Sequence, residues 1–485
     1  MRYQFFSLMF LPLLFVNCSS ELPVRKEEIT EIDQSIFGFD AEEKIILYNG
    51  TEAYDAEQRF SINGEAIVFS DLSKKTDLGQ RQEVSLSGVF FKFYQTELPI
   101  VKIQTSNNQS VGEDYNSSQF VIIDSGKVVT SGNLGIRIRG NTSRSFPKKS
   151  YRLELWEDPE GITNRNASIL GMRNDDDWLL DGMWNEPIAV RDKSAMELWL
   201  SFGRVHYRQE EPNVQLGADR RYCELFVNGA YRGLYYIGER LDRKQLKLEV
   251  VSEFVDGGEL YKAQGWGDAV GGFSLPEVDN SSITWGGYEV KYPTEEGTFD
   301  WAKLKVFKSF ILQQDINSFA MEYANHIDVE NIIDYFIFTN LIYAFDNQGN
   351  NVFIGRRDQT SPYFFVSWDF DATLGLGITG AKLPVTETGR GMNQHILTSR
   401  LLKTDGFPDA LKVRWGILRG DHLQSEKIKS FYRENYAQLL RNNVYEREAL
   451  VVGLDRSLPD PTSLSDIERI IDERLSYLDE YISEL

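Results

Sequence analysis

The chain contains little cysteine, little histidine and a deficit of positive charge. Of its two cysteines, Cys18 falls in a segment that we interpret as a leader, so Cys223 alone cannot form an intramolecular disulfide. The four histidines lie far apart in the sequence and show no zinc-ligand spacing. With 52 basic and 73 acidic residues the formal net charge is −21, which makes the polyanions nucleic acid and anionic lipid poor partners.

The apolar run at the N-terminus, Phe5 to Val16, is too short for a comfortable membrane span. It follows Met1-Arg2 and precedes Asn17-Cys18-Ser19-Ser20, an order that resembles a bacterial lipoprotein signal with Cys18 as the lipidated residue. An ordinary cleaved signal peptide is the alternative. We therefore expect a signal peptide over 1–18 and a polar linker over 19–33. The protein would be exported and would contact the bacterial cell envelope through its lipid anchor alone.

Hydrophobic residues make up 41% of the sequence, which is enough for a sizeable core. Short apolar runs separated by turns predict a small β-rich module over 34–96. From 98 onward, strand-like runs come first and helical periodicity follows, at 301–312, 316–326 and 329–345. The predicted fold class is therefore α+β, with a main domain over 98–440 and a C-terminal helical extension over 441–485.

Two local signals inside the main domain are strong. The dipeptide Asn228-Gly229, between the runs 223–227 and 233–237, predicts a tight β-hairpin. Apolar residues at helical spacing predict a helix over 188–202 that ends at Gly203 and carries Arg191 and Glu197.

The segment Lys148 to Leu155 predicts a strand whose alternation distinguishes two lysines. Lys149 shares a face with the apolar Tyr151 and Leu153, whereas Lys148 falls on the opposite face. An inward-pointing lysine needs a carboxylate or phosphate partner. A lysine that extends to solvent from the edge of the strand is the alternative.

The segment 345–377 carries the most informative pattern. Asp346 and Asn351 are separated by four residues, and Asn351 leads into an apolar run. A second run, 363–366, ends just before Asp369 and Asp371. This is the layout of a phosphoryl-transfer site, in which the first Asp accepts the proton of the acceptor hydroxyl and the Asn and the later Asp hold metal ions. Capping of turns is the alternative role for these side chains.

Longer motifs precede and include that segment: Gly-Ile-Arg-Ile-Arg-Gly-Asn-Thr-Ser-Arg at 135–144, Phe-Pro-Lys-Lys-Ser-Tyr-Arg-Leu at 146–153, Leu-Gly-Met-Arg-Asn-Asp-Asp-Asp-Trp-Leu-Leu at 170–180, Arg191 with Glu197-Leu198-Trp199, the run 224–235, and Trp368-Asp369-Phe370-Asp371. Together they resemble the spore coat protein H (CotH) kinase family over about 98–440. The resemblance implies an atypical, secreted-type protein kinase with a kinase-like fold, a β-rich N-lobe and a helical C-lobe. Such relatives lack the Gly-rich loop of ordinary kinases, and this chain has no Gly-x-Gly-x-x-Gly.

The resemblance and the chemistry of the side chains together assign roles around a metal. Asp346 would orient or deprotonate a Ser or Thr hydroxyl of a protein substrate. Asn351 and Asp369 would bind Mg²⁺ or Mn²⁺ together with the phosphates of ATP, and Asp371 would support the metal or its waters.

A second set of residues would hold the nucleotide. Lys149 would contact the α- and β-phosphates and pair with Glu197, as a strand lysine and a helix glutamate do in kinases. Arg139, Asn141 and Arg144 lie in a turn that could cradle phosphate through guanidinium and backbone N–H groups. A solvated turn is the alternative.

Two other functions compete with the kinase at this stage. One is a catalytically idle surface scaffold. The other is a carbohydrate-binding lipoprotein, suggested by the aromatic residues Trp266 and Trp285 in a Gly-rich loop. The joint presence of Asp346, Asn351 and Asp369 favours the kinase, whereas the scarcity of ATP outside the cytoplasm leaves the donor nucleotide open.

Overall fold

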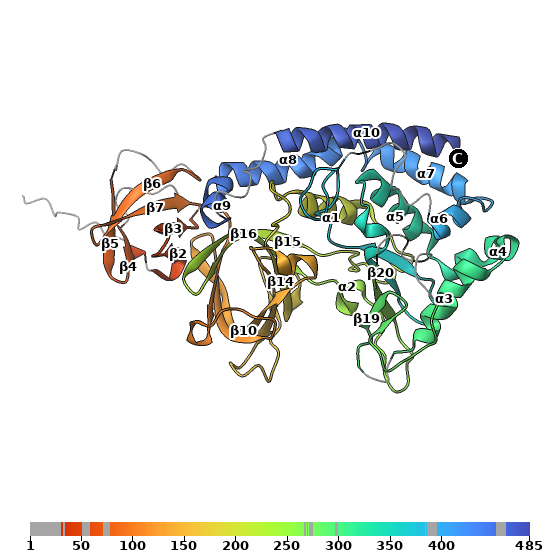
Figure 1. The fold of residues 1–485 in the computed structure, drawn as a ribbon, viewed down its shortest axis with the longest axis horizontal. Helices are drawn as coiled ribbons and strands as arrows, with labels where there is room; N and C mark the ends of the chain where they lie inside the picture. Colours follow the sequence, from red (N-terminus) through yellow and green to blue (C-terminus); the bar gives the residue numbers. More distant parts are fainter. Residues whose placement is uncertain are drawn as a thin grey trace, which may run out of the picture.

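The computed structural model describes residues 31–32, 34–50, 59–70, 78–265, 268, 270, 275–295, 299–383, 385, 395–452 and 462–485. The predicted lipidation site, Cys18, and the aromatic Trp266 lie outside the described residues. The architecture is α+β, as predicted: an open sheet, a closed barrel and a second open sheet lie in a row, with helices along one side (Figure 1). Within the described part of the chain, no helix combines the length and apolar character that crossing a bilayer requires.

Six strands from the described parts of 34–96, together with Glu31–Ile32, form a seven-stranded sheet that lies at one end of the molecule (Figure 1). In spatial order its strands are β1 (Glu31–Ile32), β4 (Arg59–Ile62), β5 (Glu65–Phe69), β6 (Arg81–Leu86), β7 (Val89–Gln95), β3 (Ile45–Tyr48) and β2 (Phe37–Asp40). The alternation in β5 leaves Ile67 and Phe69 buried and Val68 exposed, which gives this sheet an apolar core of its own.

A closed barrel follows the first sheet. Around it run β10 (Lys127–Arg139), β11 (Ser150–Trp156), β14 (Asp177–Asp181), β16 (Ala230–Glu239), β15 (Arg220–Val227), β8 (Ile100–Thr105) and β9 (Asn116–Asp124). The predicted hairpin is confirmed as β15–β16. Asn228 and Gly229 have φ of 54° and 74°, the left-handed values that a two-residue hairpin turn requires.

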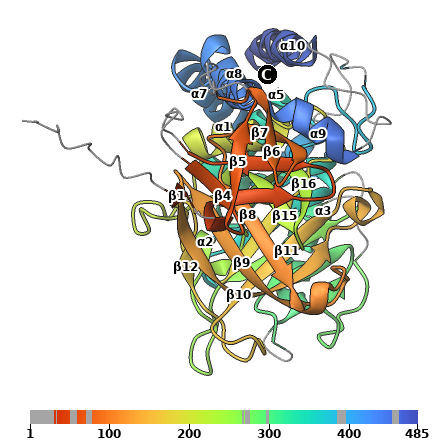
Figure 2. The same cartoon turned by 90° about the vertical axis from the view of Figure 1, so that its left-hand side faces the viewer.

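The first sheet packs directly on the barrel (Figure 2). Leu47 and Tyr94 of the sheet share a small core with Phe226 and Tyr231 of the barrel. A β-carbon at Gly38 would lie 2.2 Å from the Phe226 ring, so glycine allows β2 to approach this closely.

The second open sheet has the order β18 (Thr284–Trp285), β19 (Tyr288–Tyr292), β17 (Glu259–Gln264), β20 (Asn350–Arg356) and β21 (Phe364–Ser367). The three predicted helices before β20 are confirmed as α3 (Trp301–Gln313), α4 (Ile316–His326) and α5 (Val329–Leu341). The Asn331 side chain of α5 bonds both the N–H and the carbonyl of Phe365 in β21, at 2.7 and 3.1 Å, and so fixes the helix to the sheet.

The helical layer contains α1 (Arg191–Phe202), α6 (Ile396–Leu401), α7 (Phe407–Gly420), α8 (Ser425–Arg441), α9 (Val444–Val452) and α10 (Thr462–Glu484). α10 packs against α5, α7 and α8. Its residues Ile467 and Leu478 belong to the same apolar core as α1 and α5. The described helices of the range 441–485 therefore share their core with the main domain. The smaller elements are α2 (Arg243–Leu246), β12 (Ala167–Ser168) and β13 (Asn174–Asp175).

Candidate active site

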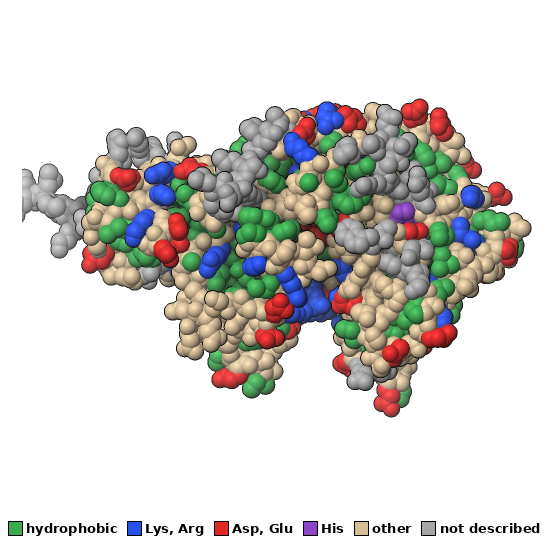
Figure 3. Space-filling view, viewed as in Figure 1, with side chains coloured by type: hydrophobic (Ala, Val, Ile, Leu, Met, Phe, Trp, Pro, Cys, Tyr) green, Lys and Arg blue, Asp and Glu red, His purple; other side chains and the backbone are tan. Residues whose placement is uncertain are grey.

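A cavity of about 630 Å³ lies between the barrel and the second open sheet. The barrel contributes the connection between β10 and β11 and the segment after β14, and the sheet contributes β17, β19 and the turns around β20 and β21. Lys and Arg side chains gather in the notch between these two parts (Figure 3). The lining nevertheless carries both charges: Arg139, Arg144, Lys148, Lys262 and Lys291 with Asp181, Glu289, Asp346, Asp369 and Asp371.

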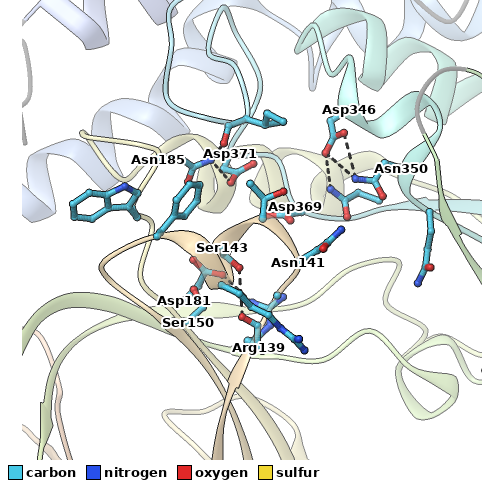
Figure 4. A pocket seen from close by; sticks show the side chains of 18 of the residues that line it. Arg139, Asn141, Ser143, Ser150, Asp181, Asn185, Asp346, Asn350, Asp369 and Asp371 are labelled. Atoms are coloured by element: carbon cyan, nitrogen blue, oxygen red, sulfur yellow. Dashed lines mark hydrogen bonds and ion pairs between the residues drawn. The ribbon is translucent and has the colours of Figure 1, made fainter. Parts of the chain in front are cut away.

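Asp346 lies in the turn that follows α5, in the wall of this cavity. Its residue is 5% exposed, and its carboxylate accepts a hydrogen bond of 2.8 Å from Asn351 Nδ2. Asn350 Nδ2 lies 3.4 Å from both carboxylate oxygens (Figure 4). Burial raises the pKa of Asp346, and the two amides and the charge of Lys262 partly offset this. The amides hold the carboxylate in one orientation.

The turn that carries Asp346 is tied to the turn that carries Asp369. Asn347 Nδ2 donates a hydrogen bond of 2.6 Å to the Trp368 carbonyl. In return the Trp368 N–H donates to the Asn351 carbonyl at 3.1 Å. One turn precedes β20 and the other follows β21. The two hydrogen bonds join these turns into one wall of the site.

The backbone of Asp369 adopts a left-handed conformation, with φ of 66°, which is unfavourable for a residue other than glycine. The segment is held by Asp192 of α1, which accepts a 2.7 Å hydrogen bond from the Phe370 N–H. Asp192 in turn pairs with the buried Arg220 at 2.6 Å, and the Arg220 guanidinium lies 5.2 Å from the centre of the Trp368 ring. Buried partners therefore fix the strained conformation.

The charge around Asp369 is unbalanced. Burial, followed by the neighbouring carboxylates of Asp192 and Asp181, raises the pKa of Asp369 to about 7, against the opposing charges of Arg139 and Lys262. Among the residues that the structure describes, none forms a hydrogen bond or ion pair with the Asp369 carboxylate. Its oxygens therefore face the cavity with excess negative charge.

Asp371 lies beside Asp369 and shares this crowding (Figure 4). Its carboxylate accepts a 2.6 Å hydrogen bond from Asn185 Nδ2. Burial and the charge of Asp369 raise the pKa of Asp371 well above its ordinary value. The proton-free forms of both carboxylates would be stabilised by a cation placed between them.

Comparison with known proteins identifies the family of this chain. The family model described as CotH kinase protein matches residues 136–483. The chain belongs to the CotH kinase family. The inner spore coat protein H of Bacillus subtilis (strain 168) is 24% identical to it over 353 residues, which cover 72% of this chain and 84% of that protein. The match includes α9 and most of α10, whereas the first sheet precedes it.

The structure reverses the predicted sides of the two lysines in this CotH-family chain. Lys148 is buried and lines the cavity, and its Nζ lies 2.5 Å from Glu448 Oε1. Lys149 is half-buried, does not line the cavity and donates to the Arg144 carbonyl at 2.6 Å. The prediction of an inward-pointing Lys149 is wrong because β11 begins only at Ser150, so strand alternation does not extend to either lysine.

Glu197 was predicted to be the partner of the inward-pointing lysine, and this too is wrong. It lies in α1 and accepts hydrogen bonds from Lys193 and, at 2.7 Å, from Asn435. The carboxylate that meets Lys148 comes from Glu448 of α9, 300 positions along the chain. Gly233 makes room for it, since a β-carbon there would lie 2.2 Å from Glu448 Oε2.

Arg139, Asn141 and Arg144 line the cavity from the connection between β10 and β11. Arg139 forms an ion pair of 2.8 Å with Asp181, and Arg144 forms an exposed one of 3.3 Å with Glu113. Arg139 is therefore held in place, whereas Arg144 and Asn141 are exposed at the rim.

Sequence reasoning missed Lys262, which lies on β17, the strand beside β20, and lines the cavity. Its positive charge opposes the rise that burial causes in the pKa values of Asp346 and Asp369. Its Nζ lies 5.9 Å from the centre of the Phe353 ring. In the described part of the chain it forms no ion pair. The signal in the sequence was a single lysine within the otherwise apolar run from Leu260 to Ala263.

Proposed function

We propose that this protein is an atypical, metal-dependent kinase that transfers a phosphoryl group from ATP to Ser or Thr hydroxyls of a protein substrate. The observation that carries the proposal is the meeting of Asp346, Asn351 and Asp369 on one wall of a charged cavity. Membership of the CotH kinase family supports the same reaction class.

Asp346 would act on the acceptor hydroxyl. Its carboxylate is oriented by the Asn351 amide, and the charge of Lys262 favours the ionised form that can accept a proton. A Ser or Thr hydroxyl entering the cavity would donate its hydrogen bond to this carboxylate and so direct its oxygen toward the phosphate.

A divalent cation such as Mg²⁺ or Mn²⁺ fits the donor set of Asp369, Asn351 and Asp371, because all three offer hard oxygen ligands. The crowded, unpaired carboxylate of Asp369 is the observation that favours it. Nowhere in the described ranges do three His, Cys, Asp or Glu side chains form a metal-binding group by themselves. Phosphate oxygens and water would therefore complete the coordination. When bound, the cation would neutralise charge on the phosphates.

The phosphates would meet cations from both sides of the cavity. Lys148, paired with Glu448, would correspond to the lysine–glutamate pair of kinases. Its glutamate comes from α9, whereas the sequence predicted Glu197 of α1. Arg139 would add a guanidinium from the barrel. Lys262, which faces both carboxylates, would contact the phosphoryl group in transfer. In this arrangement the barrel takes the place of the kinase N-lobe, and the helical layer takes the place of the C-lobe.

We also propose that the protein is exported and lipid-anchored through Cys18 in the cell envelope. The charged start, the short apolar run and the cysteine support this. The carbohydrate-binding alternative loses one of its two aromatic residues: Trp285 is 4% exposed and stacks on Trp301, with the ring centres 5.9 Å apart, so its face is not available to a sugar.

A thermal-shift measurement tests the kinase proposal. ATP with Mg²⁺ or Mn²⁺ should raise the melting temperature of the protein, because a ligand that binds only the folded state stabilises it. ATP in the presence of a chelator should produce a much smaller shift. If no nucleotide raises the melting temperature with any divalent cation, the kinase proposal fails, and a scaffold becomes the better explanation.

The two lysines give a matched pair of variants. Lys148→Met should weaken nucleotide binding by about tenfold or more, as expected when a charged hydrogen bond to a ligand is lost, whereas Lys149→Met should change it little. Because Lys148→Met removes the cation that balances the buried Glu448 carboxylate, Lys148→Met with Glu448→Gln should be measured beside it. A larger effect of Lys149→Met on the dissociation constant would contradict the assignment.

A further inference from the structure

α9 lies between the first sheet and the candidate active site. Figures 1 and 2 both place it beside that sheet, and it packs against β16 of the barrel. Successive residues of a helix point about 100° apart, so three neighbours can reach three different surroundings. Here Glu446 contacts the first sheet, Arg447 lies against the outer face of the barrel, and Glu448 meets Lys148 of the cavity lining.

The first sheet contacts α9 through Tyr94, a buried residue near the end of β7. The Tyr94 hydroxyl donates a hydrogen bond of 3.0 Å to Glu446 Oε1. The guanidinium of Arg447 lies 5.3 Å from the centre of the Tyr94 ring. One side chain of the sheet thus touches the two residues that precede Glu448, the partner of Lys148.

A second contact fixes the start of α9. Asn442, in the turn between α8 and α9, accepts hydrogen bonds through Oδ1 from Thr96 Oγ1 at 3.1 Å and from the Glu97 N–H at 2.7 Å. The Asn442 carbonyl accepts a hydrogen bond of 2.5 Å from Arg447. The segment that follows β7 therefore holds both the turn and the first residues of the helix.

Beside Tyr94, Arg447 is wholly buried and pairs with Glu224 of the barrel, which is equally buried. Two buried charges that depend on each other tolerate little displacement, because separation would leave each without a partner. Contacts with the sheet, the turn and the barrel therefore all contribute to the position of α9.

We propose that the first sheet is a positioning element for the active site, in which Tyr94 and Thr96 hold α9 where Glu448 meets Lys148. The proposal rests on the proposed function, because it assumes that Lys148 binds the nucleotide. It gives a role to the first sheet, which precedes the residues that the family model matches. Tyr94 and Thr96 are positioning residues, since they act through α9 and do not line the cavity.

The test uses the full chain and measures ATP affinity with Mg²⁺ together with the melting temperature. Tyr94→Ala should weaken binding about tenfold, within the usual range of coupling between sites. Tyr94→Phe retains the ring beside Arg447 and should recover most of the affinity. Val84→Ala, in the separate core of the first sheet, is the control: it should lower the melting temperature and leave affinity unchanged.

A double-mutant cycle separates positioning from general destabilisation. If Tyr94 acts through the Lys148–Glu448 pair, Tyr94→Ala should have little further effect on ATP affinity in a Lys148→Met background. Full additivity of the two effects would overturn the proposal. So would a Tyr94→Ala variant that binds ATP as tightly as the wild type. Wild-type protein that binds no nucleotide would overturn the proposed function as well, so the two failures are distinguishable.

Discussion

Asp369→Asn should abolish metal-dependent nucleotide binding and, in the absence of metal, raise the melting temperature at pH 8 by a few degrees. The loss follows because an amide replaces the carboxylate that would hold the cation. The gain follows because the substitution removes a negative charge that burial and the carboxylates of Asp192 and Asp181 make unfavourable. Binding assays with and without Mg²⁺ and thermal unfolding without metal measure the two effects separately.

The stabilising effect should depend on pH in a defined direction. The pKa of Asp369 is about 7 in the folded protein, above its ordinary value of 3.8, so folding favours the protonated form. The loss of folding stability caused by the ionised Asp369 carboxylate therefore grows from about pH 4 and levels off above pH 7. The advantage of Asp369→Asn should be full at pH 8 and shrink as the pH falls toward 4.

Asp405→Asn is a suitable control for this experiment, because Asp405 is exposed and lies outside the cavity lining. It should change neither metal-dependent binding nor the melting temperature. An Asp369→Asn variant that is less stable than the wild type at pH 8 without metal would show that the carboxylate is structural. Retained metal-dependent binding would remove Asp369 from the metal site.

Asp346→Asn should separate binding from turnover. If Asp346 serves as the general base for the acceptor hydroxyl, its loss should lower the transfer rate by roughly a hundredfold or more. Nucleotide affinity should stay near the wild-type value, because the asparagine oxygen can still accept the hydrogen bond from Asn351. The measurements are the dissociation constant for ATP with Mg²⁺ and the rate of autophosphorylation or of transfer to a generic protein acceptor.

The alternative role for Asp346, capping of a turn, has its own control in the same hairpin. Asp358 caps the turn between β20 and β21 by accepting hydrogen bonds from the N–H groups of Thr360 and Ser361 at 2.8 and 3.0 Å. Asp358→Asn should lower the melting temperature without a selective loss of transfer. If Asp346→Asn gives that same pattern, Asp346 has a structural role and the proposed base must be sought elsewhere.

Local patterns in the sequence determined the elements that carry the site. The runs 352–354 and 363–366 became β20 and β21, and the helical spacing before them became α5. Asp346 and Asp369 could be found together because they flank one hairpin, and the pairing of β20 with β21 brings its ends close. Such predictions succeed because each depends on a period, a turn or a spacing within one stretch of chain.

Only the tertiary structure decided which of the two neighbouring lysines lines the cavity and which carboxylate pairs with it. Strand alternation favoured Lys149, but the residues before Ser150 lie outside the regular strand, and the packing of α9 selects Lys148. Nothing local in the sequence links Lys148 to Glu448, or Tyr94 to Glu446, because these contacts form when α9 packs between the first sheet and the barrel. Sequence periodicity specifies which face of a helix or strand is buried. A contact between side chains of distant elements is fixed by the packing of the whole chain.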